Sequence, residues 1–238
     1  MLFSMEHNQK IFDLEETVAD YAARKDLFPP EQEIFAKYAR VIATGRVLDL
    51  GVGGGRTTAH LLSRCRSYRA IDYAPAMIEA CRRRFPDCAP DVFMCGDARD
   101  LSCANGANFD FVLFSYNGLD MVSHAHRIQI LGEIRRVLSP DGLFFFSAHS
   151  LHAFPFENAE VQARNNDVDL KLLQQRGWAP LIDYREDIVT YYIYPKVQKQ
   201  QLEVLGFEVV EVLDMKAAVF DFSRPPKDWM VHYVCRLG

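Results

Sequence analysis

Short apolar runs alternate with segments of helical periodicity over residues 47–147. Such alternation is typical of βαβ units, in which a parallel sheet carries helices on both faces. We expect five strands in this region, at residues 46–50, 68–72, 92–95, 109–114 and 143–148. The pattern therefore predicts an α/β fold built on an open parallel sheet.

The connecting helices are predicted from apolar residues that recur at intervals of three and four. Two such helical faces consist of Met77, Ile78, Cys81 and Phe85, and of Ile128, Leu131, Ile134 and Leu138. The sequence Ser139-Pro140-Asp141-Gly142 is expected to end the second helix and to turn the chain into the fifth strand.

The regions on either side of residues 45–150 have patterns of their own. Residues 1–44 contain two helical stripes, separated by Pro29-Pro30, and are expected to form N-terminal cap helices: Ile11, Leu14, Val18 and Tyr21, and Ile34, Phe35, Tyr38 and Ile42. Residues 151–194 lose the strand and helix rhythm and gain aromatic residues, which favours an insertion over the active face: Trp178, Tyr184, Tyr191 and Tyr192. Residues 195–238 regain it, with a helix at 197–205, a turn at Gly206, and strands at 207–213 and 229–236.

Composition limits the class of protein. The 238 residues, 49% hydrophobic and 25% charged, suit a single soluble domain. The net charge of −5 argues against a nucleic-acid partner, because phosphate binding needs a basic stripe. The six cysteines form no C-x-x-C pair, so no metal site is expected. No apolar run reaches membrane-spanning length and no secretory signal is recognised, which predicts a cytoplasmic protein.

A glycine-rich segment follows the first predicted strand, in the sequence Gly51-Val52-Gly53-Gly54-Gly55-Arg56. Glycines allow positive φ and a close approach of backbone N–H groups to a ligand, which favours a nucleotide-like cofactor. Arg56 stands where a dinucleotide fingerprint has its third glycine, and the segment lacks the lysine of a P-loop. Both of those motifs are therefore disfavoured.

Acidic and polar residues follow the other strands of the predicted sheet. Asp72 ends the second strand, 21 residues after Gly51, where a carboxylate can accept both hydroxyls of a ribose. Asp97 follows the third strand, where it can accept from the amine of adenine, and Ser115-Tyr116-Asn117 follow the fourth. Since ligands of open α/β sheets bind outside the carboxyl ends of the strands, these residues predict an adenosine-type ligand.

These elements together resemble the class I S-adenosylmethionine-dependent methyltransferases, over residues 45–150 and 195–213. The resemblance implies a Rossmann-like sheet of seven strands, six parallel and the last, at 229–236, antiparallel. The family's usual Pro-Gly-Gly turn is Pro140-Asp141-Gly142 here. Members often place an N-terminal Tyr or Arg over the methionine end of the cofactor, a role that Tyr21 or Arg24 can fill.

The resemblance implies S-adenosyl-L-methionine as cofactor and S-adenosyl-L-homocysteine as product. Arg56 is predicted to pair with the cofactor's carboxylate, and the ring of Tyr21 or Tyr116 to face its sulfonium. The predicted cofactor-binding residues are Tyr21, Asp49, Gly51, Gly53, Arg56, Asp72, Tyr73, Met77, Asp97, Ala98, Ser115 and Tyr116.

The predicted reaction is an in-line methyl transfer to oxygen or nitrogen of a small molecule, as in biosynthetic methylation. Such a transfer depends mainly on alignment of the reactants, and a histidine serves as base where the acceptor must lose a proton. His149, at the end of the fifth strand, is the favoured base and His124 the second candidate, while Asn117, Tyr191 and Tyr192 are predicted to bind the acceptor.

Two alternative functions remain open at this point. One is a non-catalytic, cofactor-binding regulatory subunit. The other is a nicotinamide-dependent oxidoreductase, which Arg56 disfavours. The sequence leaves open the identity of the acceptor, the choice between oxygen and nitrogen, the use of a base, and the oligomeric state, a homodimer included.

Overall fold

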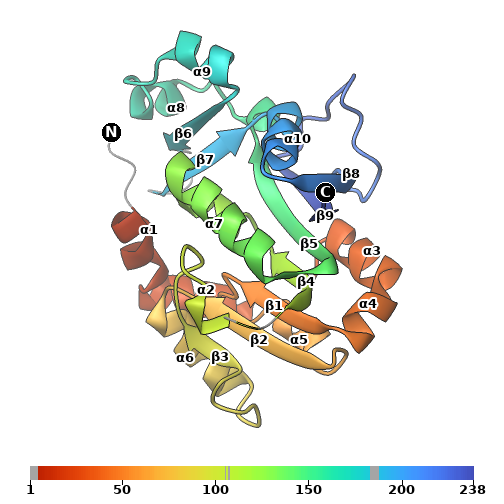
Figure 1. The fold of residues 1–238 in the computed structure, drawn as a ribbon. Helices are drawn as coiled ribbons and strands as arrows, with labels where there is room; N and C mark the ends of the chain where they lie inside the picture. Colours follow the sequence, from red (N-terminus) through yellow and green to blue (C-terminus); the bar gives the residue numbers. More distant parts are fainter. Residues whose placement is uncertain (1–4, 105, 107, 183–187) are drawn as a thin grey trace.

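The computed structural model describes residues 5–104, 106, 108–182 and 188–238, so Tyr184 lies outside the described residues. Within them a single sheet of nine strands crosses the molecule (Figure 1). The strands are β1 Arg46–Leu50, β2 Ser67–Asp72, β3 Phe93–Cys95, β4 Phe109–Phe114, β5 Leu138–Ser150, β6 Trp178–Ile182, β7 Val189–Ile193, β8 Phe207–Leu213 and β9 Met230–Leu237.

Seven of these strands form the predicted Rossmann-like core. The parallel strands run in the order β3-β2-β1-β4-β5, and β9 lies antiparallel between β5 and β8. Strand order reverses at β1, from which β2 lies on one side and β4 on the other. The predicted α/β class, the five strands of residues 46–148 and the antiparallel last strand are confirmed.

Two further strands, β6 and β7, were not predicted, and both come from the insertion. They pair antiparallel with each other, and β7 continues the sheet through parallel pairing of Tyr192 with His149 and of Ile193 with Ser150. Every residue of β7 is buried, so its sequence lacks the alternation that marks a half-exposed strand.

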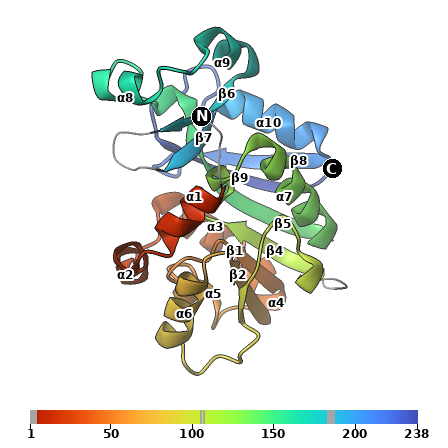
Figure 2. The same ribbon diagram turned by 90° about the vertical axis from the view of Figure 1, so that its left-hand side faces the viewer.

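Helices cover both faces of the sheet (Figures 1 and 2). One face packs against α3 Pro29–Lys37, α4 Ala39–Thr44, α5 Thr58–Leu61 and α6 Pro75–Arg84. The other packs against α7 His124–Val137 and α10 Pro195–Val204. The insertion adds α8 Ala159–Arg164 and α9 Leu170–Arg176, which lie with β6 at the top of Figure 1. Short 3-10 turns are η1 Ser102–Ala104, η2 Gly118–Met121 and η3 Leu151–Ala153.

The N-terminal stripe that ends at Tyr21 is divided between two helices, α1 Met5–Phe12 and α2 Glu15–Ala23. The break is stabilised by Asp13, whose Oδ1 accepts a hydrogen bond of 3.2 Å from the backbone N–H of Ala76 in α6. Leu14, predicted to belong to the apolar face, is therefore 48% exposed. Figure 2 shows α1 in front of the sheet, with α2 beside it.

The predicted turn at 139–142 is a bulge inside β5. Helix α7 ends at Val137, and β5 begins at the next residue. Pairing with β4 jumps from Phe109–Leu138 to Phe111–Leu143, so the residues between Leu138 and Leu143 are accommodated as an irregularity of the strand.

Three features of the described residues bear on the class of protein. No helix among the described residues is long and apolar enough to cross a membrane. The six cysteines are free thiols. Within the described part of the chain, no three His, Cys, Asp or Glu side chains gather as a metal site would require.

Candidate functional site

A pocket, here called the central pocket, opens at the carboxyl ends of β1, β2, β3 and β4. Ten of the twelve residues predicted to bind a cofactor line it, and Asp49 and Arg56 do not. Its lining consists of Phe12, Tyr21, Gly51, Gly53, Ile71, Asp72, Tyr73, Met77, Gly96, Asp97, Ala98, Phe114, Ser115, Tyr116, Gly118, Met121, Val122 and Ile130. The wall is mostly apolar, with a few converging polar groups, as small-molecule sites usually are.

The glycine segment approaches both the pocket and helix α2. Gly53 has a φ of 53°, in the left-handed region that glycine adopts without strain. Gly54 lies so close to α2 that a Cβ there would meet the backbone nitrogen of Ala22 at 2.4 Å. The segment therefore needs glycine at Gly54 for packing and at Gly53 for its backbone conformation.

Asp72 is fixed at the mouth of the glycine segment. Its Oδ2 accepts from the N–H of Gly53 at 2.8 Å and its Oδ1 from the N–H of Ala74 at 2.9 Å. Burial raises the pKa of Asp72 to about 6, against the effect of these two hydrogen bonds. Each carboxylate oxygen keeps a further lone pair with which to accept from a ligand.

Two residues beside Asp72 extend the polar side of the pocket. The hydroxyl of Tyr73 is buried without a hydrogen-bond partner in the protein, so it can bond to a polar group of a ligand or to water. Asp97 accepts from Arg99 through the backbone N–H and through Nε, each at 2.8 Å. Burial alone would raise the pKa of Asp97, but the bonds from Arg99 lower it on balance.

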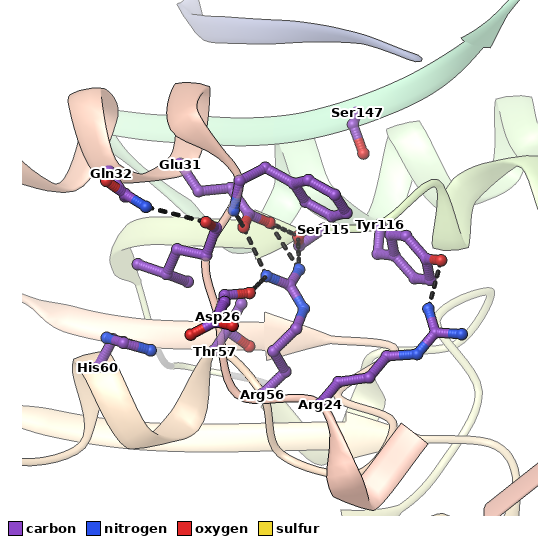
Figure 3. Close-up of polar contacts among 12 residues, drawn as sticks. Arg24, Asp26, Glu31, Gln32, Arg56, Thr57, His60, Ser115, Tyr116 and Ser147 are labelled. Atoms are coloured by element: carbon purple, nitrogen blue, oxygen red, sulfur yellow. Dashed lines mark hydrogen bonds and ion pairs between the residues drawn. The ribbon is translucent and has the colours of Figure 1, made fainter. Parts of the chain in front are cut away.

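Arg56, predicted to meet an anionic ligand group, instead binds a buried carboxylate of the protein (Figure 3). Its Nη1 donates to Glu31 Oε2 at 2.5 Å and to the carbonyl of Asp26 at 3.1 Å. Its Nη2 donates to Glu31 Oε1 at 2.7 Å and to Ser115 Oγ at 2.9 Å. These bonds hold the pKa of Glu31 below its usual value although burial would raise it. Arg56 thus joins helix α3 to the glycine segment and to the end of β4.

Arg24 lies at the other side of the glycine segment and is more open to solvent. It donates to the hydroxyl of Tyr116, as Figure 3 shows, and to Asp20 Oδ2 at 2.5 Å. Its guanidinium stands over the rings of Tyr21 and Tyr116, at 4.7 and 4.9 Å from their centroids. It shares a small recess with Tyr21, Tyr116, Asp49 and the glycine segment. Arg56 lines this recess as well, but its side chain is 10% exposed, whereas that of Arg24 is 34% exposed.

Asp49 holds the end of β1. It is 1% exposed, and its Oδ2 accepts from Thr57 Oγ1 at 2.6 Å and from the hydroxyl of Tyr68 at 2.7 Å. Burial raises the pKa of Asp49 to about 6. Both bonds go to the protein, which makes this carboxylate an anchor of the loop beneath the recess.

The segment after β4 has an unusual backbone. Tyr116 and Asn117 have φ of 52° and 59°, a conformation that costs a non-glycine residue of order 1 kcal/mol or more. The N–H of Asn117 donates to Ser147 Oγ at 2.9 Å, which holds the turn against β5. The turn places Tyr116 in the wall of the central pocket and Asn117 toward β5.

His149 lies at the end of β5, outside the lining of the central pocket but connected to it by aromatic rings. Trp229 lies between His149 and Tyr116 of the pocket wall, and its ring centroid is 5.9 Å from that of His149 and 6.2 Å from that of Tyr116. Tyr192 lies on another side of the imidazole, at 5.0 Å. The imidazole contacts Asp120 through Nδ1, at 3.0 Å, and Asn117 through Nε2, at 3.1 Å. The structure therefore brings together the predicted residues Asn117, His149 and Tyr192.

His124 and Tyr191 lie in a separate cluster. His124 stacks on Trp178 at 4.0 Å, and its Nδ1 is 2.7 Å from the hydroxyl of Tyr191. Burial lowers the pKa of His124, with a contribution from the nearby Arg127. Tyr191 has no exposed surface, so it packs against protein neighbours in this conformation and does not face an open cavity.

Several residues of the candidate site were not predicted from the sequence. Phe12 and Met121 line the pocket from elements whose approach to the sheet has no local signal. Asp120 could have been noticed in the sequence, because an acid between the apolar residues Leu119 and Met121 indicates a buried carboxylate. Glu31 is fully buried at the start of a helix, and its partner Arg56 is 25 residues away.

Comparisons with known proteins bear on the cofactor and the reaction. A family model described as a methyltransferase domain matches residues 47–142. The malonyl-[acyl-carrier protein] O-methyltransferase of Halorhodospira halophila is 32% identical over 174 residues, which are 68% of this chain and 57% of that protein. The chain thus spans a little over half the length of that relative.

Solved structures share the fold along almost the whole chain. The methyltransferase CcbJ from Streptomyces caelestis superimposes with a TM-score of 0.64 at 17% identity, over 93% of this chain and 96% of that one. The glycopeptide N-methyltransferase MtfA in complex with S-adenosyl-L-methionine gives a TM-score of 0.60 at 19% identity, over 91% and 96%.

Proposed function

We propose that this chain is a class I S-adenosylmethionine-dependent methyltransferase that methylates oxygen or nitrogen of a small molecule, since a methyltransferase-domain model matches its residues 47–142 and solved methyltransferases share its fold. The observation that carries the proposal is the arrangement of Asp72. Its carboxylate is held by the glycine segment in an apolar pocket, next to an unpartnered hydroxyl of Tyr73. This donor and acceptor set fits an adenosine with a free ribose.

The residues of the central pocket fit S-adenosylmethionine, whose bound sulfonium supplies an electrophilic methyl group. Asp72 would accept from the ribose hydroxyls, and Asp97 with the backbone of Ala98 would meet the adenine. We assign the carboxylate of the methionine end to Arg24, since four N–H groups of Arg56 already have partners in the protein. The rings of Tyr21 and Tyr116 then lie where an aromatic face favours a cation.

The chain's contribution to methyl transfer is mainly alignment and exclusion of water. Helices α1 and α2 contribute Phe12 and Tyr21 to the wall of the pocket. His149 stands beyond Trp229, on the side from which an acceptor would approach, and accepts a proton there. Asn117, Tyr192 and Trp229 surround its ring, and Tyr192 comes from β7 of the insertion.

The proposal extends to the setting of the enzyme. A net charge of −5 and the absence of a basic stripe in the sequence support a small-molecule acceptor over a nucleic acid. We propose a cytoplasmic enzyme, because no apolar run of the sequence reaches membrane-spanning length. Whether it works as a homodimer is decided by sedimentation of the purified chain at several concentrations.

Calorimetry tests the cofactor. We expect a measurable heat of binding for S-adenosylmethionine and for S-adenosylhomocysteine, and none for NAD. Asp72→Ala should weaken binding by about 1–3 kcal/mol, the usual loss for hydrogen bonds to a charged group. Asp87→Ala, which changes an exposed acid before β3, is the control and should bind as the unchanged chain does. Preferential binding of NAD, or unchanged affinity in Asp72→Ala, would contradict the assignment.

Release of S-adenosylhomocysteine tests the reaction. The purified chain is incubated with S-adenosylmethionine and a panel of small hydroxyl and amine acceptors, with a reaction lacking acceptor as control. Acceptor-dependent release supports the enzyme. Tight cofactor binding without release on any acceptor would favour the cofactor-binding regulatory subunit instead.

A further inference from the structure

We propose that Asp120 is a positioning residue for His149, which it holds in the tautomer that leaves Nε2 free to take a proton from the acceptor. The inference rests on the proposed function and narrows its substrate class. Asp120 comes from η2, and His149 from the end of β5.

Asp120 contacts the histidine twice through one oxygen. Its Oδ2 accepts from the backbone N–H of His149 at 2.6 Å and lies 3.0 Å from Nδ1 of the ring. A carboxylate only accepts, so this contact requires the proton of a neutral imidazole to be on Nδ1. The ring is thereby fixed in position and in tautomer by one fully buried group.

Arg127 fixes the other oxygen of Asp120. Both side chains have no exposed surface, and Nη1 of Arg127 donates to Oδ1 of Asp120 and, at 3.1 Å, to the carbonyl of Leu119. The remaining donors of Arg127 go to Gln198 and Gln201 of α10. A buried ion pair of this kind adds little net stability, but it prevents the carboxylate from turning.

Asn117 completes the arrangement on the far side of the ring. Its Nδ2 lies 3.1 Å from Nε2 of His149, and its Oδ1 is buried without a hydrogen-bond partner. An amide can donate to a neutral Nε2 and, after a half-turn, accept from a protonated one. Nε2 has a single lone pair, so the amide of Asn117 must turn away before the acceptor's proton can reach it, and its oxygen can then accept from the protonated ring.

This arrangement defines the class of acceptor as one that must lose a proton, a hydroxyl or a protonated amine. The acceptor's oxygen or nitrogen forms its bond to the methyl carbon, the pair of the broken carbon–sulfur bond stays on sulfur, and the acceptor's proton goes to Nε2. His149 then returns that proton to water. A thioether or a tertiary amine has no such proton and would gain nothing from the dyad of Asp120 and His149.

The first test needs no acceptor. Long-range proton–nitrogen NMR of the ¹⁵N-labelled chain, with and without S-adenosylhomocysteine, reports which imidazole nitrogen of His149 bears the proton; His149→Gln assigns its signals. We expect a protonated Nδ1 and an unprotonated Nε2. The opposite tautomer, or exchange between the two, would overturn the proposal whatever the chain's activity.

The second test is Asp120→Asn. The donors of Arg127 hold the new amide oxygen, so its NH₂ faces Nδ1 and should reverse the tautomer. We expect kcat on the active acceptor of the panel to fall about 100-fold or more, as for loss of a general base, with unchanged affinity for S-adenosylhomocysteine. With S-adenosylmethionine saturating, so that protonation of Asp72 does not limit turnover, the decrease toward acid in the pH profile of kcat should disappear. His152→Ala changes a neighbouring histidine that contacts Tyr194 and should leave the profile intact.

These tests distinguish the positioning role of Asp120 from the proposed methyl transfer. An Asp120→Asn chain with the reversed tautomer and full activity overturns the positioning role, while the proposed methyl transfer stands. If no acceptor is methylated, the proposed function fails, and the wild-type tautomer still decides the arrangement of the dyad. Should Asp120→Asn not fold, the same wild-type spectrum remains the deciding measurement.

Discussion

The two arginines beside the glycine segment show how much a single residue's role depends on its partner. Arg56 has the position in sequence that favours an anion contact, yet Glu31 reaches it from helix α3 and takes both ends of its guanidinium. No local pattern marks a pair whose members are 25 residues apart. Asp72 and Asp97 were found because strand ends lie in the sequence itself, whereas Glu31 and Asp120 needed the tertiary structure.

The charge on Glu31 is predicted to be a large contributor to stability. Glu31→Gln leaves Arg56, which is 8% exposed, without its anion, and breaking such a buried pair costs about 3–5 kcal/mol. Urea unfolding of the variant measures this loss. Glu208→Gln breaks an exposed pair with Arg236 and should cost less than about 1 kcal/mol. Equal effects of the two substitutions would mean that Arg56 finds another partner.

Protonation of Asp72 is expected to weaken cofactor binding in acid. Burial raises its pKa to about 6, so the carboxylate that accepts from the ribose is lost as the pH falls through that value. Affinity for S-adenosylhomocysteine should be constant above pH 7 and decrease by up to tenfold per unit below pH 6. Calorimetry from pH 5 to 8 measures this slope. Asp72→Asn should lose most of it, and an unchanged slope would assign the titration to another group.

At the scale of elements, the seven core strands were predictable because each is a short apolar run bounded by turn residues. Strand β7 was not, since its five residues are all buried and their sequence does not alternate. Residues 139–142 were predicted to form a turn and instead form a bulge in β5. Pro140 and Gly142 are typical of turns and of strand bulges alike, so the local sequence does not distinguish the two. The break between α1 and α2 depends on a contact of Asp13 with α6, which a helical period does not contain.

The packing of α2 on the glycine segment is predicted to control cofactor affinity. Gly54→Ala places a Cβ 2.4 Å from the backbone of Ala22, so α2 must move and take Tyr21 and Arg24 with it. We expect calorimetry to show at least a tenfold loss of affinity for S-adenosylhomocysteine. Gly132→Ala, inside α7 with nothing within 4 Å, should keep the affinity and stabilise the helix by about 0.5–1 kcal/mol. A Gly54→Ala chain with full affinity would show that α2 does not position these residues.

At the scale of the whole molecule, the buried His232 of β9 sets one limit on stability in acid. Neither ring nitrogen has a hydrogen-bond partner, and burial lowers the pKa of His232 to about 4, against the raising effect of nearby Glu31. The unfolded chain binds this proton near pH 6.5, so between about pH 6.5 and 4 acid favours unfolding through this residue. Asp49 and Asp72 act in the opposite sense, because their pKa values are raised to about 6 and their protonation favours the folded state.

His232→Phe separates these opposing contributions, because it leaves both aspartates in place and keeps a ring beside Phe145. The free energy of unfolding, measured by urea at each pH, should differ little in its pH dependence between the two chains above pH 7. As the pH falls from 6.5 to 4, the free energy of unfolding of the variant should rise relative to that of the unchanged chain by up to about 3 kcal/mol. This amount follows from a difference of roughly two to three units between the pKa of His232 in the unfolded and folded chains. A difference that stays constant over this range would mean that His232 finds a polar partner when it is protonated.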